Sequence, residues 1–452
     1  MTAIIRRAIE QGPKSPFQKA AMPVRLDRQS ADFDQRFRDF LAAKREVSAD
    51  VERATRAIVD DVAARGDAAL LEATKKFDRL DIDAAGLRIT PAEIDAAVAA
   101  CDPKTVEALK FARDRIETFH RRQLPKDERF TDAAGVELGW RWSAVDAVGL
   151  YVPGGTAAYP SSVLMNAVPA KVAGVPRVVM VVPAPDGKLN PLVLAAAHLG
   201  GVSEIYRVGG AQAVAALAYG TATIAPVAKI VGPGNAYVAA AKRLVFGKVG
   251  IDMIAGPSEV LVIADDTGNA DWIAADLLAQ AEHDVSAQSI LITDSARLAA
   301  DVERAVEAQL ATLPRAAIAR ASWDEFGAVI KVAKLDDAVE LANAIAAEHL
   351  EIMTADAEGL SKKVRNAGAI FLGAHTPEAI GDYVGGSNHV LPTARSARFS
   401  SGLGVLDFMK RTSILRCGPD QLRALGPAAM TLGQAEGLDA HSRSVGLRLN
   451  LS

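Results

Sequence analysis

The strongest constraint on the fold is a regular alternation of short apolar segments and alanine-rich segments between about residues 146 and 373. Buried strands are indicated by "RVVMVVPA", "AKIVGPGN" and "SEVLVIAD", which have the length and composition of strands and end near Gly or Pro. Crossover helices are indicated between them by stretches such as "PLVLAAAHLG" and "AYVAAAKRLVFG". This order predicts βαβ units, and therefore an α/β protein with parallel sheets.

The alternation is preceded by helical patterns and followed by a loop-rich stretch and a polar helical tail. We therefore expect two Rossmann-like but incomplete parallel-sheet domains, an N-terminal helical arm and a small C-terminal helical domain. The expected division is residues 1–21 as a disordered extension, 22–40 as the arm, 41–150 with 259–403 as the first α/β domain, 151–258 as the second, and 404–452 as the tail. Residues 1–21 precede a second methionine, Met22, so they are either an extension or a misplaced start.

Composition excludes several classes of protein. A net charge of −4 and a pI near 6.0 give no basic excess for binding nucleic acid. No apolar run reaches the ~20 residues that span a bilayer, so no membrane partner is expected. The chain has 2 cysteines, too few for a disulfide framework or a four-thiolate zinc site. This cysteine content indicates a cytoplasmic location.

Four glycine-containing turns are candidates for ligand contact. They contain Tyr151, Gln212, Asn235 and Ser258, in "YVPGG", "VGGAQ", "VGPGN" and "AGPSE". In open α/β sheets, ligands bind beyond the carboxyl ends of the strands, and helix N-termini there can approach phosphates. None of these turns is a G-x-G-x-x-G, so each one alone could equally be an ordinary turn.

Several polar residues could hold a metal or act in catalysis. Gln280 and His283 are three residues apart on a predicted helix and share a face, although such a histidine is more often solvated than metal-bound. Asp382 and His389 lie together in a Gly-rich loop, which is a common setting for functional groups. Glu436 lies in the polar tail, where a solvated helix is the simpler explanation.

His441 lies in the same tail, and the same explanation applies to it. Glu348 and His349 are adjacent in "IAAEHLEIMTAD", between a helical pattern and a short apolar run. An acid beside an imidazole can be a catalytic pair, or simply two polar residues at the end of a helix. The dipeptide alone leaves both interpretations open.

Taken together and in order, these segments resemble the histidinol dehydrogenase family from about Arg25 to the C-terminus. The matching stretches are "VGLYVPGGTAAYPSSVLMNAVPAKVAG", "VGGAQAVAALAYGT", "VGPGNAYVAAAKR", "DMIAGPSEVLVIAD", "LLAQAEHD", "AAEHLEI", "GDYVGGSNHVLPT" and "EGLDAHSRSVGLRL". The resemblance implies NAD-dependent oxidation of L-histidinol through L-histidinaldehyde to L-histidine, the last two steps of histidine biosynthesis. It also implies two NAD+ per turnover and one Zn2+ per subunit.

The same resemblance assigns site residues. The implied zinc ligands, which also contact substrate, are Gln280, His283, Asp382 and His441. The implied catalytic pair is Glu348 and His349, and His349 also contacts substrate. The implied NAD contacts are Tyr151, Gln212 and Asn235, which lie within residues 151–258. The further implied substrate contacts are Ser258 and Glu436. His441 and Glu436 would act across a homodimer through an exchanged 404–452 tail, while the role of His389 is left open.

The chemistry of these residue types agrees with the implied reaction. Hydride leaves an alcohol carbon only if the hydroxyl proton also leaves, and an imidazole with a pKa near ~6.5 suits that proton transfer. The aldehyde must be hydrated before a second hydride departs, which requires a base that activates water. We assign the first task to His349 and the second to Glu348, with zinc positioning the substrate.

Two other functions compete with this interpretation. A related zinc- and NAD-dependent dehydrogenase could act on a sulfonated diol, but the carboxylate of Glu436 would repel a sulfonate and attract the ammonium group of histidinol. A non-catalytic metal- or nucleotide-binding protein would not need the pair Glu348 and His349. Neither cysteine lies in a matching catalytic segment, so a mechanism through a cysteine thiohemiacetal is disfavoured.

Overall fold

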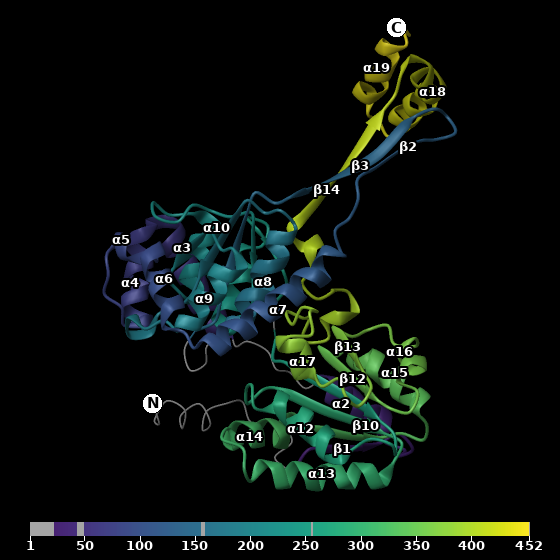
Figure 1. Ribbon diagram of the computed structural model, residues 1–452. Helices are drawn as coiled ribbons and strands as arrows, with labels where there is room; N and C mark the ends of the chain where they lie inside the picture. The colour runs from purple at the N-terminus through teal and green to yellow at the C-terminus, as the bar shows by residue number, and fades with distance from the viewer. Residues whose placement is uncertain (1–21, 43–48, 155–158, 255, 452) are drawn as a thin grey trace.

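Two parallel sheets, each covered by helices on both faces, form the body of the molecule, and a narrow tail projects from it (Figure 1). The computed structural model describes residues 22–42, 49–154, 159–254 and 256–451. The expected disorder of residues 1–21 lies outside this part. Among the described residues, no helix combines the length and apolar character that crossing a membrane requires.

The larger sheet has six parallel strands in the order β1-β11-β10-β9-β12-β13. Its strands are β1 (Val24–Asp27), β9 (Glu259–Ala264), β10 (Gln288–Thr293), β11 (Ala328–Lys331), β12 (His349–Met353) and β13 (Ala369–Leu372). Alternate residues of β9 enter opposite cores, with Val260 and Val262 on one face and Leu261 and Ile263 on the other. Strands buried on both faces explain why the sequence shows continuous apolar runs here.

Helices cover both faces of this sheet. They are α2 (Phe33–Ala42), α15 (Leu335–Ile345) and α16 (Ala357–Ser361) on one face, and α12 (Ala270–Ala281), α13 (Ala296–Leu310) and α14 (Ala316–Phe326) on the other. In α13 the buried residues Leu298, Val302 and Val306 recur every four positions and form one apolar stripe. The helix begins where the Ser295 hydroxyl accepts a hydrogen bond of 3.1 Å from the Leu298 N–H.

The smaller sheet has five parallel strands in the order β6-β5-β4-β7-β8. They are β4 (Ala147–Tyr151), β5 (Arg177–Val181), β6 (Glu204–Tyr206), β7 (Lys229–Val231) and β8 (Gly250–Ile251). One face is covered by α6 (Pro91–Ala100), α7 (Pro103–Arg121), α8 (Pro160–Val172) and α9 (Pro191–Gly200). The other face is covered by α3 (Ala49–Arg65), α4 (Asp67–Asp78), the short α5 (Ala84–Leu87), α10 (Gly210–Tyr219) and α11 (Ala236–Val245).

The expected division of the chain into domains differs from this arrangement. Residues 41–150 were expected to join 259–403, but the helices between residues 49 and 121 pack on the smaller sheet. The strand β4, which we expected to precede the second domain, pairs with both β5 and β7 inside it. The N-terminal arm is not purely helical either, because β1 pairs with β11 before α2 begins. An amphipathic pattern predicts a helix but does not say which sheet it covers.

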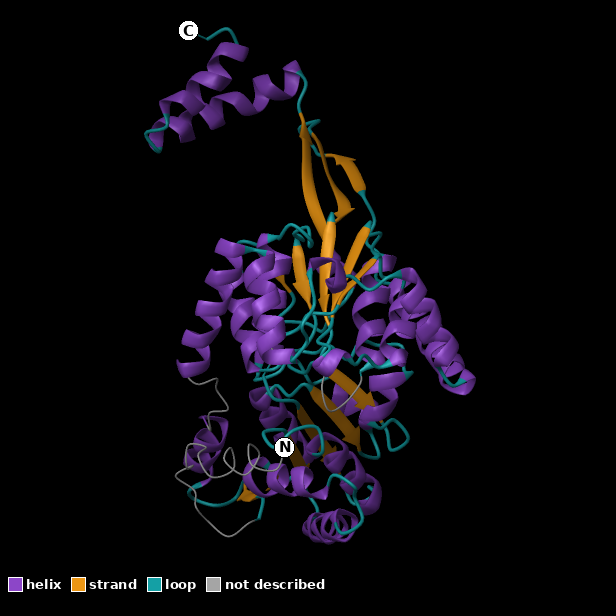
Figure 2. Cartoon of the chain, turned by 90° about the vertical axis from the view of Figure 1, so that its left-hand side faces the viewer, coloured by secondary structure: helices purple, strands orange, loops and turns teal. Residues whose placement is uncertain are grey.

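The projecting tail combines strands and helices. An antiparallel sheet of three strands, β14 (Met409–Arg416), β3 (Glu137–Ala144) and β2 (Glu128–Thr131), leads away from the body to α18 (Pro419–Ala435) and α19 (Asp439–Arg448) (Figures 1 and 2). The 404–452 segment was expected to be helical, but its first part is the short 3-10 turn η3 (Val405–Phe408) and then β14. Several apolar side chains of the tail are exposed, namely Phe130, Leu415, Leu425, Leu432, Leu438 and Leu447.

Candidate active site

The residues expected to carry the chemistry lie at the amino end of the larger sheet. His349 is the first residue of β12, and Ser258 directly precedes β9, the neighbouring strand. The turn "AGPSE" was expected beyond the carboxyl end of a strand. Ser258 does follow β8 (Gly250–Ile251) of the smaller sheet, and it also directly precedes the amino end of β9 in the larger sheet. The short helix α17 (Glu378–Tyr383) and the loop that follows it bring Asp382 to the same end of the sheet.

The Glu348 and His349 side chains are buried next to each other, at 5% and 4% exposure. Glu348 Oε2 accepts a hydrogen bond of 3.0 Å from the Glu259 N–H. His349 Nδ1 lies 3.2 Å from the Glu259 carbonyl oxygen, so this nitrogen carries the proton and donates. The other ring nitrogen, Nε2, has no hydrogen-bond partner and lies 3.6 Å from Asp382 Oδ1. A buried imidazole with an unpartnered Nε2 is a candidate proton acceptor.

The electrostatics of the pair follow from burial among carboxylates. Burial raises the pKa of Glu348 to about 7, against the opposing effect of His349. Burial alone would lower the pKa of His349, but Glu378, Glu348 and Asp382 together raise it well above 6.5. A cation bound by Asp382 would offset the negative charge of that carboxylate. The pKa of His349 would then fall back toward the range in which imidazole accepts a proton.

Three of the four expected zinc ligands lie in this region and fit a metal ion. Gln280, in the last turn of α12, is fully buried, and its Oε1 has no hydrogen-bond partner, while its Nε2 lies 3.3 Å from His283 Nδ1. Burial lowers the pKa of His283, which favours the neutral form that binds metals, and Asp382 is near enough to influence it. A neutral imidazole and a carboxylate are common zinc donors, and the unpartnered amide oxygen of Gln280 is a less usual one.

Acidic residues that the sequence analysis did not single out surround the same site. Atoms of His349, Glu378 and Asp382 lie within 4.8 Å of one another, so Glu378 is a further candidate ligand. Glu351 Oε1 accepts a hydrogen bond of 2.8 Å from the Glu378 N–H, which fixes the start of α17. Burial raises the pKa of both Glu351 and Glu378. The sequence did offer one sign of Glu351, because an acidic residue within the apolar run "LEIM" is unusual for a buried strand.

His389 contacts the backbone of Asp382, which lies in α17 and not in the loop expected from the sequence. Its Nδ1 lies 2.9 Å from the Asp382 carbonyl oxygen, and its Nε2 lies 3.2 Å from the Ser162 hydroxyl of α8. Burial lowers the pKa of His389, so the ring bridges the two groups in its neutral form. Because α8 belongs to the smaller-sheet domain, this contact joins both sheet domains at the site.

The three expected cofactor residues lie at the carboxyl edge of the smaller sheet. Tyr151 ends β4, and its hydroxyl oxygen accepts a hydrogen bond of 3.0 Å from the Gly210 N–H, two residues before the buried Gln212. Asn235 caps α11, where its side-chain oxygen accepts from the N–H groups of the next turn at 3.0 and 3.2 Å. This edge is where open α/β sheets bind nucleotides.

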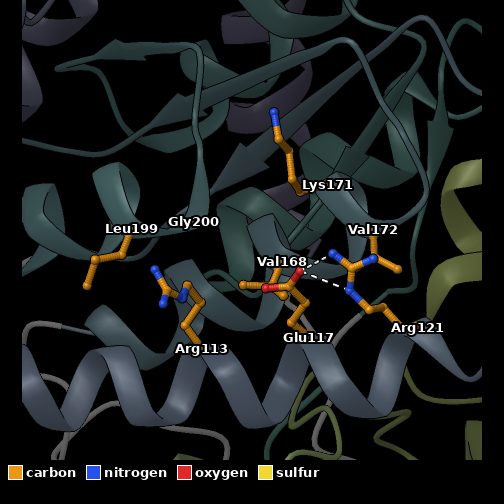
Figure 3. Close-up of a pocket in the computed structure, with 8 residues that line it drawn as sticks. All are labelled: Arg113, Glu117, Arg121, Val168, Lys171, Val172, Leu199 and Gly200. Carbon is orange, nitrogen blue, oxygen red and sulfur yellow. Dashed lines mark hydrogen bonds and ion pairs between the residues drawn. The ribbon is translucent and has the colours of Figure 1, made fainter.

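The remaining two expected residues are not near the site within one chain. Glu436 and His441 are exposed residues of the α18–α19 pair, at the far end of the projecting tail (Figure 2). A polar hollow between α7, α8 and α9 is also separate from the site (Figure 3). It is lined by Arg113, Glu117, Arg121, Val168, Lys171, Val172, Leu199 and Gly200, none of which is an expected site residue.

Comparison with known proteins gives a consistent result. The family model described as histidinol dehydrogenase matches residues 41–449. Histidinol dehydrogenases from Bradyrhizobium diazoefficiens and Rhodopseudomonas palustris are 85% and 82% identical, each over 95% of this chain and 100% of the relative. The crystal structure of histidinol dehydrogenase from Elizabethkingia anophelis matches with a TM-score of 0.90 and 34% identity, over 96% of this chain and 99% of that one. The chain therefore belongs to the histidinol dehydrogenase family.

Proposed function

We propose that this chain oxidises L-histidinol to L-histidine in two successive NAD+-dependent steps at the site around His349. The first step converts the alcohol and NAD+ to the aldehyde, NADH and a proton. The second converts the aldehyde, water and a second NAD+ to the carboxylate, NADH and two protons. The observation that carries the proposal is the buried pair of Glu348 and His349 beside Gln280, His283 and Asp382, in a chain of this family.

His349 and Glu348 would act as the two bases. The unpartnered Nε2 of His349 would accept the hydroxyl proton as hydride leaves the alcohol carbon. Glu348, held in place by the Glu259 N–H, would take a proton from the water that adds to the aldehyde. Their burial excludes bulk water, which protects the aldehyde between the two steps.

Gln280, His283 and Asp382 would hold a zinc ion, with His441 of a second subunit as the fourth ligand. When bound, the metal supplies electrostatic attraction for the nitrogen atoms of histidinol and so fixes the orientation of the alcohol carbon. Support for this set comes from the buried Gln280 Oε1, which has no partner within the described chain.

The homodimer belongs to the same proposal. The tail holds α18 and α19 away from the body (Figure 1). Its exposed residues include Glu436, His441 and the leucines Leu425, Leu432, Leu438 and Leu447. A tail exchanged between two copies would cover those leucines and complete each site with Glu436 and His441 from the other subunit.

Both cysteines, Cys101 and Cys417, are free thiols, which supports the proposed cytoplasmic location.

The test is the absorbance of NADH formed from L-histidinol by the purified protein before and after chelation. We expect two NADH per histidinol, loss of the activity after chelation, and recovery on adding zinc. Turnover of a sulfonated diol in place of histidinol would contradict the proposal.

Glu348→Gln is expected to separate the two steps. The amide keeps the shape of the side chain but cannot accept a proton, so aldehyde oxidation should fall by about 10²-fold or more while alcohol oxidation changes little. Because burial raises the pKa of Glu348 to about 7, aldehyde oxidation by the unaltered protein should increase as the pH rises through that value. The variant should lose that pH dependence. Equal loss of both steps in Glu348→Gln would show that the assigned role is wrong.

A further inference from the structure

The turn after β7, one of the three turns at the expected cofactor edge, has a tightly constrained backbone. Gly232 begins this turn with φ +111°, a backbone conformation that only glycine adopts readily. A Cβ atom on Gly232 would lie 2.2 Å from the Tyr151 carbonyl oxygen. The turn therefore packs directly against the backbone of Tyr151, another of the expected cofactor residues, and a small displacement of Gly232 would displace both.

A buried ion pair holds this glycine from both sides. Lys242 of α11 and Asp252, which follows β8, form a salt bridge with side chains only 3% and 1% exposed. The Lys242 ammonium donates a hydrogen bond of 2.9 Å to the Gly232 carbonyl oxygen. The Gly232 N–H donates a hydrogen bond of 2.7 Å to Asp252 Oδ2. Two successive peptide groups of the turn are thus bound by one pair of charges.

The contacts of the pair are with the protein backbone and with each other. The Lys242 side chain is only 3% exposed, and two of its three N–H donors are directed at Asp252 and the Gly232 carbonyl oxygen, so it is poorly placed to bind a phosphate group at the turn. Asp252 Oδ1 accepts the Met253 N–H at 2.7 Å, which fixes the start of the connection from β8 to β9. Burying two charges gains little stability compared with apolar residues of similar size, so stability alone does not explain the pair.

We propose that Lys242 and Asp252 are positioning residues for NAD+, which hold the Gly232–Asn235 turn in the conformation that the dinucleotide requires. The inference rests on the proposed function, because it assumes that NAD+ binds at this edge of the smaller sheet. Neither side chain is expected to touch the cofactor. Both act through the Gly232 backbone, and through it on Asn235 and Tyr151.

The test compares Lys242→Met, Asp252→Asn and the double variant Lys242→Met/Asp252→Asn in the full-length zinc-loaded protein. Each single variant leaves one buried charge without its partner and can therefore destabilise the fold. The double variant removes both charges with little change in shape, so its thermal unfolding should return close to that of the unaltered protein. Lys229→Met is the matched control, because Lys229 lies on β7 and binds Asp407 rather than the turn.

We expect the double variant to show a KM for NAD+ raised by about tenfold or more, equivalent to one lost hydrogen bond to a charged group. Its KM for histidinol and its zinc content should stay within about twofold of the unaltered protein, and Lys229→Met should change neither KM. Titration of NAD+ without histidinol should show the same weakening. A double variant with normal NAD+ affinity would overturn the inference alone. No NAD+ binding by the unaltered protein would overturn the proposed function as well.

Discussion

His349→Ala is expected to lower kcat for histidinol oxidation by about 10³-fold, or roughly 4 kcal/mol in activation free energy. The reason is that His349 offers the buried, unpartnered ring nitrogen of the pair, and no other described imidazole lies in contact with Glu348. The KM for NAD+ should change little, because the expected cofactor residues belong to the other sheet. Stopped-flow measurement of NADH from histidinol, and separately from histidinaldehyde, would resolve the two steps.

Two controls make this result specific. His375→Ala removes an exposed histidine that precedes α17, and it should leave both oxidation steps unchanged. Zinc content should be measured in His349→Ala, because Asp382 Oδ1 lies 3.6 Å from His349 Nε2 and a lost ligand would mimic a lost base. A variant that kept full alcohol oxidation with normal zinc, and lost only aldehyde oxidation, would reverse the roles assigned to the pair.

The two parallel sheets could be predicted because their strands are buried on both faces. Each strand expected between residues 146 and 373 is present. A short continuous apolar run such as that of β9, bounded by turn residues, is typical of a strand of a parallel sheet that is buried on both faces. The ribbon of β2, β3 and β14 was not predicted. Its strands are largely exposed and contain many charged residues. Few of their side chains are buried, so the sequence does not show the alternation of apolar and polar residues by which a half-buried strand is recognised.

The sequence named candidate site residues but did not predict how they are arranged. Gln280 and His283 follow from helical spacing, and the structure places them in contact. Glu378 was missed because one turn of helix separates it from Asp382, and nothing local shows that both approach His349. The candidate catalytic residues lie at the amino end of the larger sheet, and the expected cofactor residues lie at the carboxyl edge of the smaller one. This arrangement depends on how the two sheet domains pack, which no local sequence pattern encodes.

Mixed dimers provide the sharpest test of how the tail contributes. Homodimers of His349→Ala and of His441→Ala should both be nearly inactive, because one lacks the base and the other a zinc ligand. In a mixed dimer, the subunit with intact His349 would receive the intact His441 of its partner if the tail is exchanged. One complete site would then form in each mixed dimer. If the tail instead folded back onto its own site, no site in the mixed dimer would be complete.

We therefore expect purified mixed dimers, isolated by two different affinity tags after co-expression, to recover about half of the unaltered kcat. The matched control mixes His349→Ala with Asp382→Ala. Both residues belong to the same subunit's site, where their side chains lie 3.6 Å apart, so no site of this mixed dimer holds both and no recovery is expected in either arrangement. Absence of recovery in the His349→Ala and His441→Ala mixture, with normal dimer formation, would place His441 at its own subunit's site. The projecting tail seen in one chain would then have to bend back toward Asp382, which β14, paired along its whole length with β3, opposes.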